Sequence, residues 1–237
     1  MAEMKDRVVH RLVYEYLVDK IEKQFSQNAF SCRKNKGLLK AIRRAQNLAR
    51  KNKSSYVLKI DIKKFFDSIN HDILVQKINS FAFDKEVLML CEIIVRSFKE
   101  KGMPIGNVTS QIYSHIYLCG LDRLLERSPN MGFVRYGDDV LIFIKDREEA
   151  VELLKLIKFE LSLLSLEINF TSSYLRKARS GFIFLGCKIF PKERRLKDRD
   201  KLLNRVNKRN FRTYIDIFQK HDRSFLEKIN IEILSKI

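Results

Sequence analysis

The sequence has few of the residues that separate domains or place a chain in a membrane. Its 237 residues include three prolines and eight glycines, with no stretch rich in glycine and serine, so no flexible linker is expected. No apolar run approaches the roughly 20 residues of a membrane-spanning helix, and the N-terminus has no signal-peptide pattern. With 45% hydrophobic residues, we expect one large domain or two small ones and no membrane partner.

Cysteine and histidine are also scarce. The four cysteines lie far apart and form no Cys-x-x-Cys pair, so neither a zinc site nor a small disulfide framework is indicated. The four histidines are isolated, and none has a metal-ligand neighbour in the sequence. Reduced cysteines are typical of cytosolic proteins, and we therefore expect a cytoplasmic location.

Acidic residues are outnumbered by basic ones. Lys and Arg total 47 against 29 for Asp and Glu, which gives a net charge of +18. Such a surplus indicates a polyanionic partner, with nucleic acid as the first candidate and an anionic membrane surface as the second.

Two adjacent aspartates interrupt the apolar run at 133–143. Residues 136–139 read Tyr-Gly-Asp-Asp, with hydrophobic, β-prone residues on both sides. A glycine before polar residues at such a junction predicts a tight β-hairpin. The turn would expose two carboxylates, and carboxylate oxygens are ligands that Mg²⁺ prefers. Asp and Gly are also common in ordinary turns, so this motif alone leaves a solvated turn open.

Hydrophobic spacing predicts a mixed order of helices and strands. Helices are expected at about 5–27, 38–51 and 72–98, from about 107 and 146 onward, and in the basic tail 192–237; strands are expected at 56–61, 133–143, 167–175 and 182–190. This order indicates an α+β fold in which one compact sheet carries all the acidic candidates.

A further acid, Asp61, ends the first of these strands. Alternation puts Lys59 and Asp61 on the face opposite to Leu58 and Ile60, so the carboxylate is well placed to meet a ligand. If the strands of Asp61 and Asp138 are neighbours, the two carboxylates converge. Two metal ions roughly 4 Å apart would then activate a 3′-hydroxyl and stabilise the leaving pyrophosphate.

From about Arg7 to Pro191 the chain resembles a reverse transcriptase. Residues 61–67, Asp-Ile-Lys-Lys-Phe-Phe-Asp, resemble the first catalytic motif of that family's palm, and the tetrad at 136–139 resembles its catalytic tetrad. The resemblance implies a right-hand polymerase fold: an antiparallel palm sheet with helical fingers and a short helical thumb. The implied domains are partial fingers at 1–55, palm at 56–70, fingers or palm helices at 71–101, palm with a primer-grip-like hairpin at 102–191, and a reduced basic thumb at 192–237.

The same resemblance implies an activity, RNA-directed DNA synthesis. A primer 3′-hydroxyl would attack the α-phosphate of a deoxynucleotide, with template RNA, a DNA or RNA primer, the cDNA product and dNTPs as partners. Asp61, Asp138 and Asp139 would be the catalytic acids. Together with the Ile62 carbonyl they would hold two Mg²⁺ ions, for which Mn²⁺ can substitute. Phe66 would be the steric gate that excludes the 2′-hydroxyl of a ribonucleotide.

Further contacts are expected around these acids. The residues expected at the nucleotide are Lys63, Lys64, Phe65, Phe66, Ile105, Gly106 and Gln111. The residues expected at the nucleic acid are Arg33, Lys34, Lys36, Tyr136, Phe184, Leu185 and Gly186. Other interpretations stay open: Phe66 and the hairpin at 182–190 as core, and the lysines at 63–64 and the basic loop at 33–36 as solvated surface.

The segment 104–111, Pro-Ile-Gly-Asn-Val-Thr-Ser-Gln, narrows the resemblance. Group II intron and retron enzymes usually have Pro-Gln-Gly here, whereas Ile-Gly followed by Ser-Gln resembles the reverse transcriptases of diversity-generating retroelements of bacteria, archaea and phages. Those enzymes copy a template RNA with errors at adenines and act with a small basic accessory protein. Ile105 replaces a glutamine that contacts the incoming nucleotide. Because an apolar side chain cannot supply that hydrogen bond, we expect relaxed fidelity.

Three departures from the family leave other functions open. The chain begins almost at Asp6, so the fingertip strands that normally precede this point are expected to be missing. Residues 169–173 stand where the family usually has Asn-Pro-x-Lys-Thr, and Ser172 replaces a lysine thought to help protonate pyrophosphate. The thumb after Pro191 is short. A catalytically weak nucleic-acid-binding subunit is one alternative, and an RNA-dependent RNA polymerase, against which Phe66 argues, is another.

Overall fold

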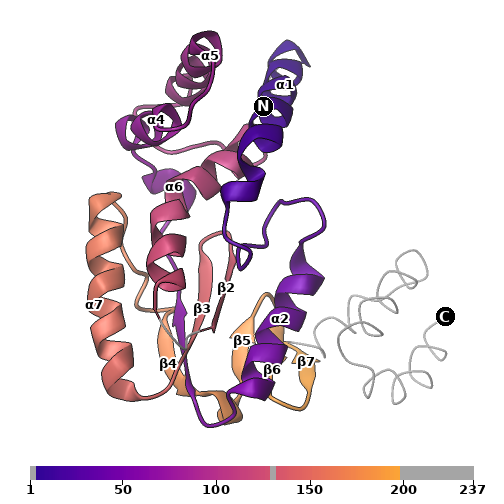
Figure 1. Cartoon of the computed structure of the whole chain (residues 1–237), viewed down its shortest axis with the longest axis vertical. Coiled ribbons are helices and arrows are strands. Elements are labelled where there is room, and N and C mark those ends of the chain that lie inside the picture. Colours follow the sequence, from indigo (N-terminus) through magenta and orange to yellow (C-terminus); the bar gives the residue numbers. More distant parts are fainter. Residues whose placement is uncertain (1–3, 129–131, 198–237) are drawn as a thin grey trace, which may run out of the picture.

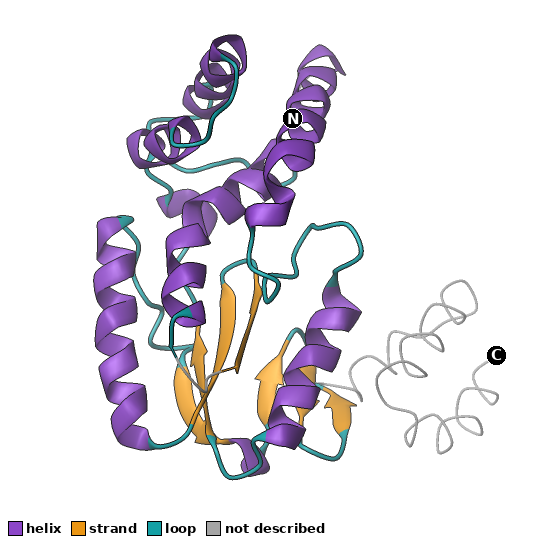
Figure 2. Cartoon of the chain, viewed as in Figure 1, coloured by secondary structure: helices purple, strands orange, loops and turns teal. Residues whose placement is uncertain are grey.

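A four-stranded antiparallel sheet organises the part of the chain that the computed structural model describes, residues 4–128 and 132–197. Its strands are β1 (Tyr56–Ile60), β2 (Gly132–Tyr136), β3 (Asp139–Ile144) and β4 (Tyr174–Lys177), in the order β2-β3-β1-β4. The central strands β1 and β3 therefore carry the acids of both motifs. Figures 1 and 2 show the sheet between layers of helix.

Apolar side chains cover both faces of this sheet. Leu58, Phe133 and Ile142 belong to one hydrophobic cluster, and their strand neighbours Val57 and Val134 belong to another. Successive residues of a strand point to opposite faces, so the strands are apolar throughout because each face has its own partner. Both faces of the sheet are consequently buried.

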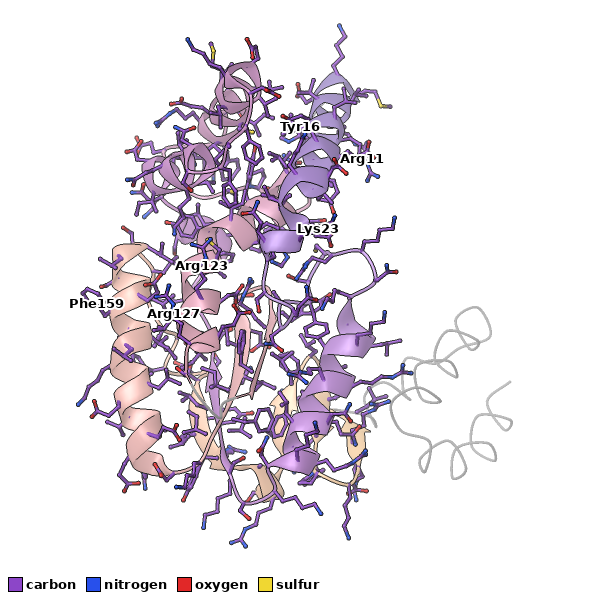
Figure 3. All side chains as sticks on the ribbon, viewed as in Figure 1. Arg11, Tyr16, Lys23, Arg123, Arg127 and Phe159 are labelled. Carbon is purple, nitrogen blue, oxygen red and sulfur yellow. The ribbon has the colours of Figure 1, made fainter. Side chains whose placement is uncertain are left out.

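Helices on the first face form the larger cluster. The face is packed by α6 (Val108–Glu126) and α7 (Arg147–Leu163), with α1 (Met4–Ile21), α4 (His71–Asn79) and α5 (Lys85–Arg96) beyond them (Figure 1). The Tyr16 hydroxyl of α1 donates to Asp84, directly before α5, at 2.5 Å (Figure 3). The helix expected from about 146 onward is confirmed as α7: at its start Asp146 Oδ1 accepts the Glu149 N–H at 2.9 Å, as an N-cap should.

The second face is covered by α2 (Leu38–Lys51) and a small second sheet. That sheet has the order β5-β6-β7, with strands β5 (Phe182–Phe184), β6 (Cys187–Ile189) and β7 (Arg194–Leu196). Tyr174 of β4 joins the two sheets, because its hydroxyl accepts the Ile183 N–H at 2.8 Å and donates to the Ile183 carbonyl at 3.2 Å.

The α+β prediction with antiparallel sheets is confirmed, as is the helix at 38–51. The acidic candidates lie at the strand ends of one sheet, as expected, and a second sheet is present beside it. Two local expectations were wrong. The stretch 167–175 is mainly turn, with one isolated bridge and β4 starting only at Tyr174, and residues 194–196 form β7 rather than helix. The helical tail otherwise lies outside the described residues. No helix in the described part is both long and apolar enough to span a bilayer.

Candidate active site

The Tyr-Gly-Asp-Asp tetrad forms the predicted hairpin. Tyr136 pairs with Asp139, which leaves Gly137 and Asp138 as a two-residue turn between β2 and β3. Gly137 has φ +64°, a conformation that glycine adopts at little cost and that primed hairpin turns require. The turn carries Asp138 at the tip of a strand pair whose other residues are mostly buried.

Asp61 reaches the same edge of the sheet from β1. The antiparallel register of β1 with β3 ends at Ile60 opposite Val140, so continuing it by one residue places Asp61 opposite Asp139. The strands of Asp61 and Asp138 are therefore neighbours, as the sequence interpretation required. The charge of Asp61 also raises the pKa of both Asp138 and Asp139, which shows that the three acids share one electrostatic environment.

Burial makes this environment unfavourable for the carboxylates. Removal from water is the largest cause that raises the pKa of Asp138, and the charge of Asp61 raises it further. Burial is likewise the largest cause that raises the pKa of Asp139, with Lys59 acting in the opposite direction. Because like charges and burial both penalise ionised carboxylates, the site would gain from a bound cation.

Lys59 already supplies one positive charge. Its Nζ lies 3.1 Å from Oδ1 of Asp139, and the two side chains are only 13% and 21% exposed. Within residues 4–128 and 132–197, no group of three or more His, Cys, Asp or Glu side chains is gathered closely enough to hold a metal ion. The oxygen donors suit Mg²⁺, and the arrangement leaves Asp61 and Asp138 as the acids available to a cation, with Asp139 engaged by Lys59.

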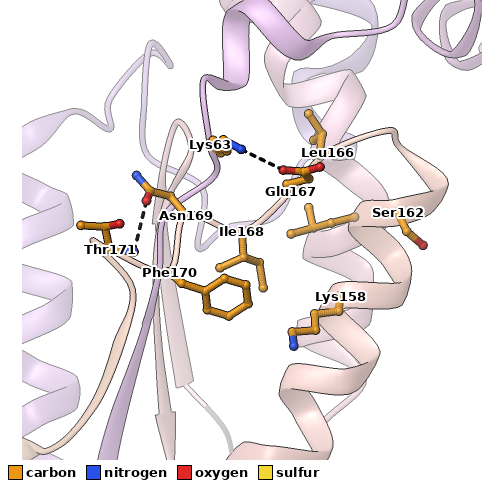
Figure 4. Close-up of a pocket in the computed structure, with 10 residues that line it drawn as sticks. Lys63, Lys158, Ser162, Leu166, Glu167, Ile168, Asn169, Phe170 and Thr171 are labelled. Atoms are coloured by element: carbon orange, nitrogen blue, oxygen red, sulfur yellow. Dashed lines mark hydrogen bonds and ion pairs between the residues drawn. The ribbon is translucent and has the colours of Figure 1, made fainter.

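The turn at 169–173 surrounds Asp61. Asn169 Nδ2 and Ser172 Oγ both donate to Oδ2 of Asp61, at 2.9 and 2.6 Å, and Ser173 Oγ accepts the Asp61 N–H at 3.0 Å. An open hollow of about 480 Å³ lies beside this turn, at whose rim Lys63 pairs with Glu167 (Figure 4). The segment expected as a strand at 167–175 forms this turn instead. Its polar groups make hydrogen bonds to Asp61 and not to a neighbouring strand.

The first of two adjacent phenylalanines expected at the nucleotide is in the core. Phe65 is 2% exposed and packs edge-on against Tyr117, so the expectation that it contacts a nucleotide was wrong. Phe66 is half-buried, and its carbonyl accepts the Met103 N–H at 2.8 Å. Gly102 makes this approach possible, since a Cβ there would lie 3.0 Å from the Phe66 carbonyl oxygen.

The other residues expected at the nucleotide differ in accessibility. Ile105 is 82% exposed, on the loop that Met103 ties to Phe66. The neighbouring Gly106 is also exposed, and Gln111 is half-buried in α6. Lys63 and Lys64 are exposed, while Ile62 is buried and bridges to Ile168.

In the basic loop, Arg33 is turned inward. Its side chain is 6% exposed and donates to the carbonyls of Glu22, Ser26 and Ala29, so the expectation of a template contact was wrong for this residue. Lys34 is exposed, and Lys36 donates to the Gln27 carbonyl at 2.7 Å. The guanidinium stabilises the loop from within because it ties together three carbonyls along residues 22–29.

The hairpin at 182–190 combines core and surface. Phe184 is fully buried in the second cluster, so its expected contact with nucleic acid was wrong. Leu185 and Gly186 form the turn with φ +48° and +77°, the pattern of a type I′ turn. Lys197 N–H donates to the Gly186 carbonyl at 2.8 Å. Tyr136 is half-buried.

Sequence reasoning missed the support beneath the tetrad. Arg135 is fully buried on the α6 side of β2, and its Nε and Nη2 donate to the two oxygens of Asp122 at 2.7 and 2.5 Å. Its Nη1 donates to the Gly137 carbonyl at 3.1 Å. The one signal was a charged residue inside an apolar strand, since buried charges require partners.

Known proteins resemble this chain in sequence. The family described as reverse transcriptase (RNA-dependent DNA polymerase) matches residues 1–189. The putative COX1/OXI3 intron 2 protein of Saccharomyces cerevisiae is 25% identical over 72% of this chain and 28% of its own length. Protein YkfC of Escherichia coli is 21% identical over 81% of this chain and 62% of its own length. The chain therefore spans less than two thirds of these relatives.

Solved structures share the fold. Apo telomerase from Candida tropicalis has a TM-score of 0.60 at 13% identity, over 80% of this chain and 40% of that one. Telomerase from Candida albicans in complex with a fragment of telomeric RNA has a TM-score of 0.58 at 14% identity, over 89% and 40%. At such identity the similarity shows the arrangement of helices and strands alone.

Proposed function

Because the chain belongs to the reverse transcriptase family, we propose that it carries the catalytic site for RNA-directed synthesis of DNA. The observation that carries the proposal is the antiparallel register of β1 with β3, which ends at Ile60 opposite Val140. Continued by one residue, this register sets Asp61 opposite Asp139, beside the turn that holds Asp138. Acids of two distant motifs meet at one sheet edge, on the face that α2 and the second sheet cover. The strand ends that carry these acids would receive the template and primer.

In the proposed reaction the primer 3′-oxygen forms a bond to the α-phosphorus of a dNTP. The bond from that phosphorus to the bridging oxygen breaks, pyrophosphate leaves, and the hydroxyl proton passes to solvent. Bound Mg²⁺ ions would supply activation of the hydroxyl and charge for the leaving group. Asp61 and Asp138 would hold them, with the Ile62 carbonyl assisting, and Asp139 would support the site through Lys59.

Mutation of Asp138 tests this assignment. Asp138→Ala should abolish template-dependent dNTP incorporation in a primer-extension assay with Mg²⁺ or Mn²⁺, while the circular dichroism spectrum keeps its α+β shape. Glu152→Ala, an exposed acid on α7 that pairs with Lys155, is the matched control and should extend primers like the parent. An Asp138→Ala protein that extends primers normally would refute the site.

Phe66 supports a preference for deoxynucleotides. It lies five residues after Asp61, is half-buried and is tied to the loop of Ile105, so its ring would face the sugar. Phe66→Ala should increase incorporation of NTPs relative to dNTPs. Equal use of both nucleotides by the parent chain would instead favour an RNA-dependent RNA polymerase.

We also propose membership of the diversity-generating subgroup. Ile105 is strongly exposed beside Gly106, so it can approach a base pair without offering it a hydrogen bond. Ile105→Gln should lower misincorporation at template adenines, measured by sequencing the cDNA; unchanged error rates would contradict the idea. A small basic accessory protein would then be a partner, and the neighbouring DNA would carry a repeat pair that differs at adenines.

A second candidate function is a nucleic-acid-binding subunit with weak catalysis. It is favoured by Ser172 in the place expected for a lysine. The net charge of +18 would provide RNA binding that weakens steeply with salt. Salt-sensitive RNA binding without Mg²⁺-dependent extension would select this alternative.

A further inference from the structure

The turn at 169–173 makes several hydrogen bonds to a single residue, Asp61. Besides the two bonds to Oδ2, the Asn169 N–H donates to the Asp61 carbonyl at 2.8 Å. Ser173 Oγ accepts the Asp61 N–H from the other side. Backbone and side chain of Asp61 are therefore both fixed by a segment more than a hundred positions away in the sequence.

The direction of the Asn169 amide is set independently. The Thr171 N–H donates to its Oδ1 at 3.2 Å (Figure 4). An amide carries its acceptor and its donors on opposite arms, so this bond turns Nδ2 toward Asp61. The contact to Oδ2 is thus a consequence of the turn and not a free rotamer choice.

These contacts make the two carboxylate oxygens of Asp61 differ in their hydrogen bonding. Oδ2 accepts two hydrogen bonds, and Oδ1 accepts none from side chains or backbone of the described residues. We propose that Ser172 is a positioning residue that, with Asn169, occupies Oδ2 and presents Oδ1 of Asp61 to a divalent cation. The inference rests on the proposed function, in which Asp61 holds the metal.

The hydroxyl of Ser172 is neutral, so its hydrogen bond leaves the negative charge of Asp61 available to a cation. Lys59 already neutralises Asp139 nearby, so Asp61 and Asp138 supply the charge that attracts a metal.

The test uses the full chain and Mn²⁺ alone. Unbound Mn²⁺ is measured by electron paramagnetic resonance for the parent, Ser172→Ala and Ser172→Thr. Loss of a group that orients a metal ligand typically weakens metal binding by about 10- to 100-fold, and we expect that range for Ser172→Ala. Ser172→Thr keeps the donor and should retain the parent affinity.

Thr171→Ala is the matched control, because it removes a hydroxyl from the same turn and leaves the backbone N–H that orients Asn169. It should bind Mn²⁺ like the parent. Thermal midpoints of the Ser172 and Thr171 variants should agree, which separates positioning of Asp61 from loss of the fold. Parent-like Mn²⁺ affinity of Ser172→Ala would overturn the inference.

Asp61→Asn and Asp138→Asn distinguish a failure of the proposed metal site from a failure of the proposed role of Ser172. If both weaken Mn²⁺ binding while Ser172→Ala does not, only the role of Ser172 fails. If neither of them weakens it, the metal site itself fails, and the positioning role fails with it. If both aspartate variants and Ser172→Ala weaken binding and Ser172→Thr restores it, both proposals are supported.

Discussion

Lys59 Nζ lies 3.1 Å from Oδ1 of Asp139, in an ion pair that bridges the central strands β1 and β3. Lys59 is directly opposite Leu141 in the register, so it reaches diagonally along the sheet to the acid of the tetrad. Burial raises the pKa of Asp139, and Lys59 lowers it. The lysine is therefore what favours ionised Asp139 in a shielded place.

Replacing this lysine should make catalysis more sensitive to acid. In Lys59→Met the pKa of Asp139 rises further, because burial and the charges of Asp61 and Asp138 are then unopposed by Lys59. The acidic limb of the pH dependence of kcat/KM for primer extension should move to higher pH, with a larger loss at pH 6 than at pH 8. Each unit of pKa corresponds to about 1.4 kcal/mol.

The control for this change is Lys155→Met. Lys155 pairs with Glu152 on the exposed face of α7, with side chains 66% and 70% exposed, and such pairs contribute little. Its pH profile should match that of the parent. An acidic limb that stays in place in Lys59→Met would show that Asp139 does not depend on the pair.

The buried ion pair of Arg135 and Asp122, under the turn of Gly137 and Asp138, should contribute strongly to the free energy of unfolding. Asp122→Ala leaves the guanidinium of Arg135 buried without its carboxylate, a change that typically costs about 3–5 kcal/mol. Denaturation with urea would measure the free energy of unfolding. Asp72→Ala, which breaks the exposed pair with Arg96, should cost at most about 1 kcal/mol. Similar losses for both variants would contradict the importance of the buried pair.

The meeting of Asp61 with the tetrad could be predicted because each acid directly follows or interrupts a run of strand-forming residues. The partners of Asp61 could not, because a turn without periodicity, distant in sequence, supplies Asn169 and Ser172. Phe65 and Phe66 are adjacent and have the same side chain, so the sequence cannot tell which of them is in the core. The structure shows that it is Phe65, which packs against Tyr117. A sequence shows which groups are polar or apolar, but it does not show that the guanidinium of Arg33 turns inward to bind the carbonyls of Glu22, Ser26 and Ala29.

His115 should make stability depend on pH in a defined window. Its pKa is lowered to about 3, first by burial and then by the charge of Arg135. Nδ1 lies 3.3 Å from Arg135 Nη2, which can only donate, and Nε2 lies 2.8 Å from the Ser31 carbonyl. The ring is therefore neutral, with its proton on Nε2.

The direction in which stability changes with pH follows from these protonation states. Below the ordinary pKa of 6.5 the unfolded chain takes up a proton on this histidine and the folded chain does not. Stability from His115 is thus present above that pH and falls by up to about 1.4 kcal/mol per pH unit toward pH 3. Urea unfolding of His115→Gln between pH 7 and 4 should show a shallower decline than the parent. Replacement of the exposed Lys155 by Met should leave the slope unchanged; equal slopes for parent and His115→Gln would count against a buried neutral ring.

The ionised carboxylate of Asp138 should lower the free energy of unfolding at neutral pH unless a cation is bound. Its pKa is raised above the ordinary 3.8, chiefly by burial, so the folded chain favours the protonated acid. The resulting stability is complete below the ordinary pKa and is lost as the pH rises through the raised value. Asp138→Asn removes this loss, and in a chelating buffer its thermal midpoint should exceed that of the parent at pH 7 but not at pH 4.

Addition of Mg²⁺ should reverse the order of the two thermal midpoints at pH 7, so that the parent unfolds at a higher temperature than Asp138→Asn. A cation that binds the folded state stabilises the parent by mass action, whereas Asp138→Asn lacks one of the charges that would hold it. One kcal/mol moves the midpoint by about 2–4 °C for a chain of this size, which differential scanning calorimetry measures easily. Asp72→Asn, at the exposed pair with Arg96, is the control and should respond to Mg²⁺ like the parent. Equal Mg²⁺ responses of the parent and Asp138→Asn would show that this carboxylate does not bind the ion.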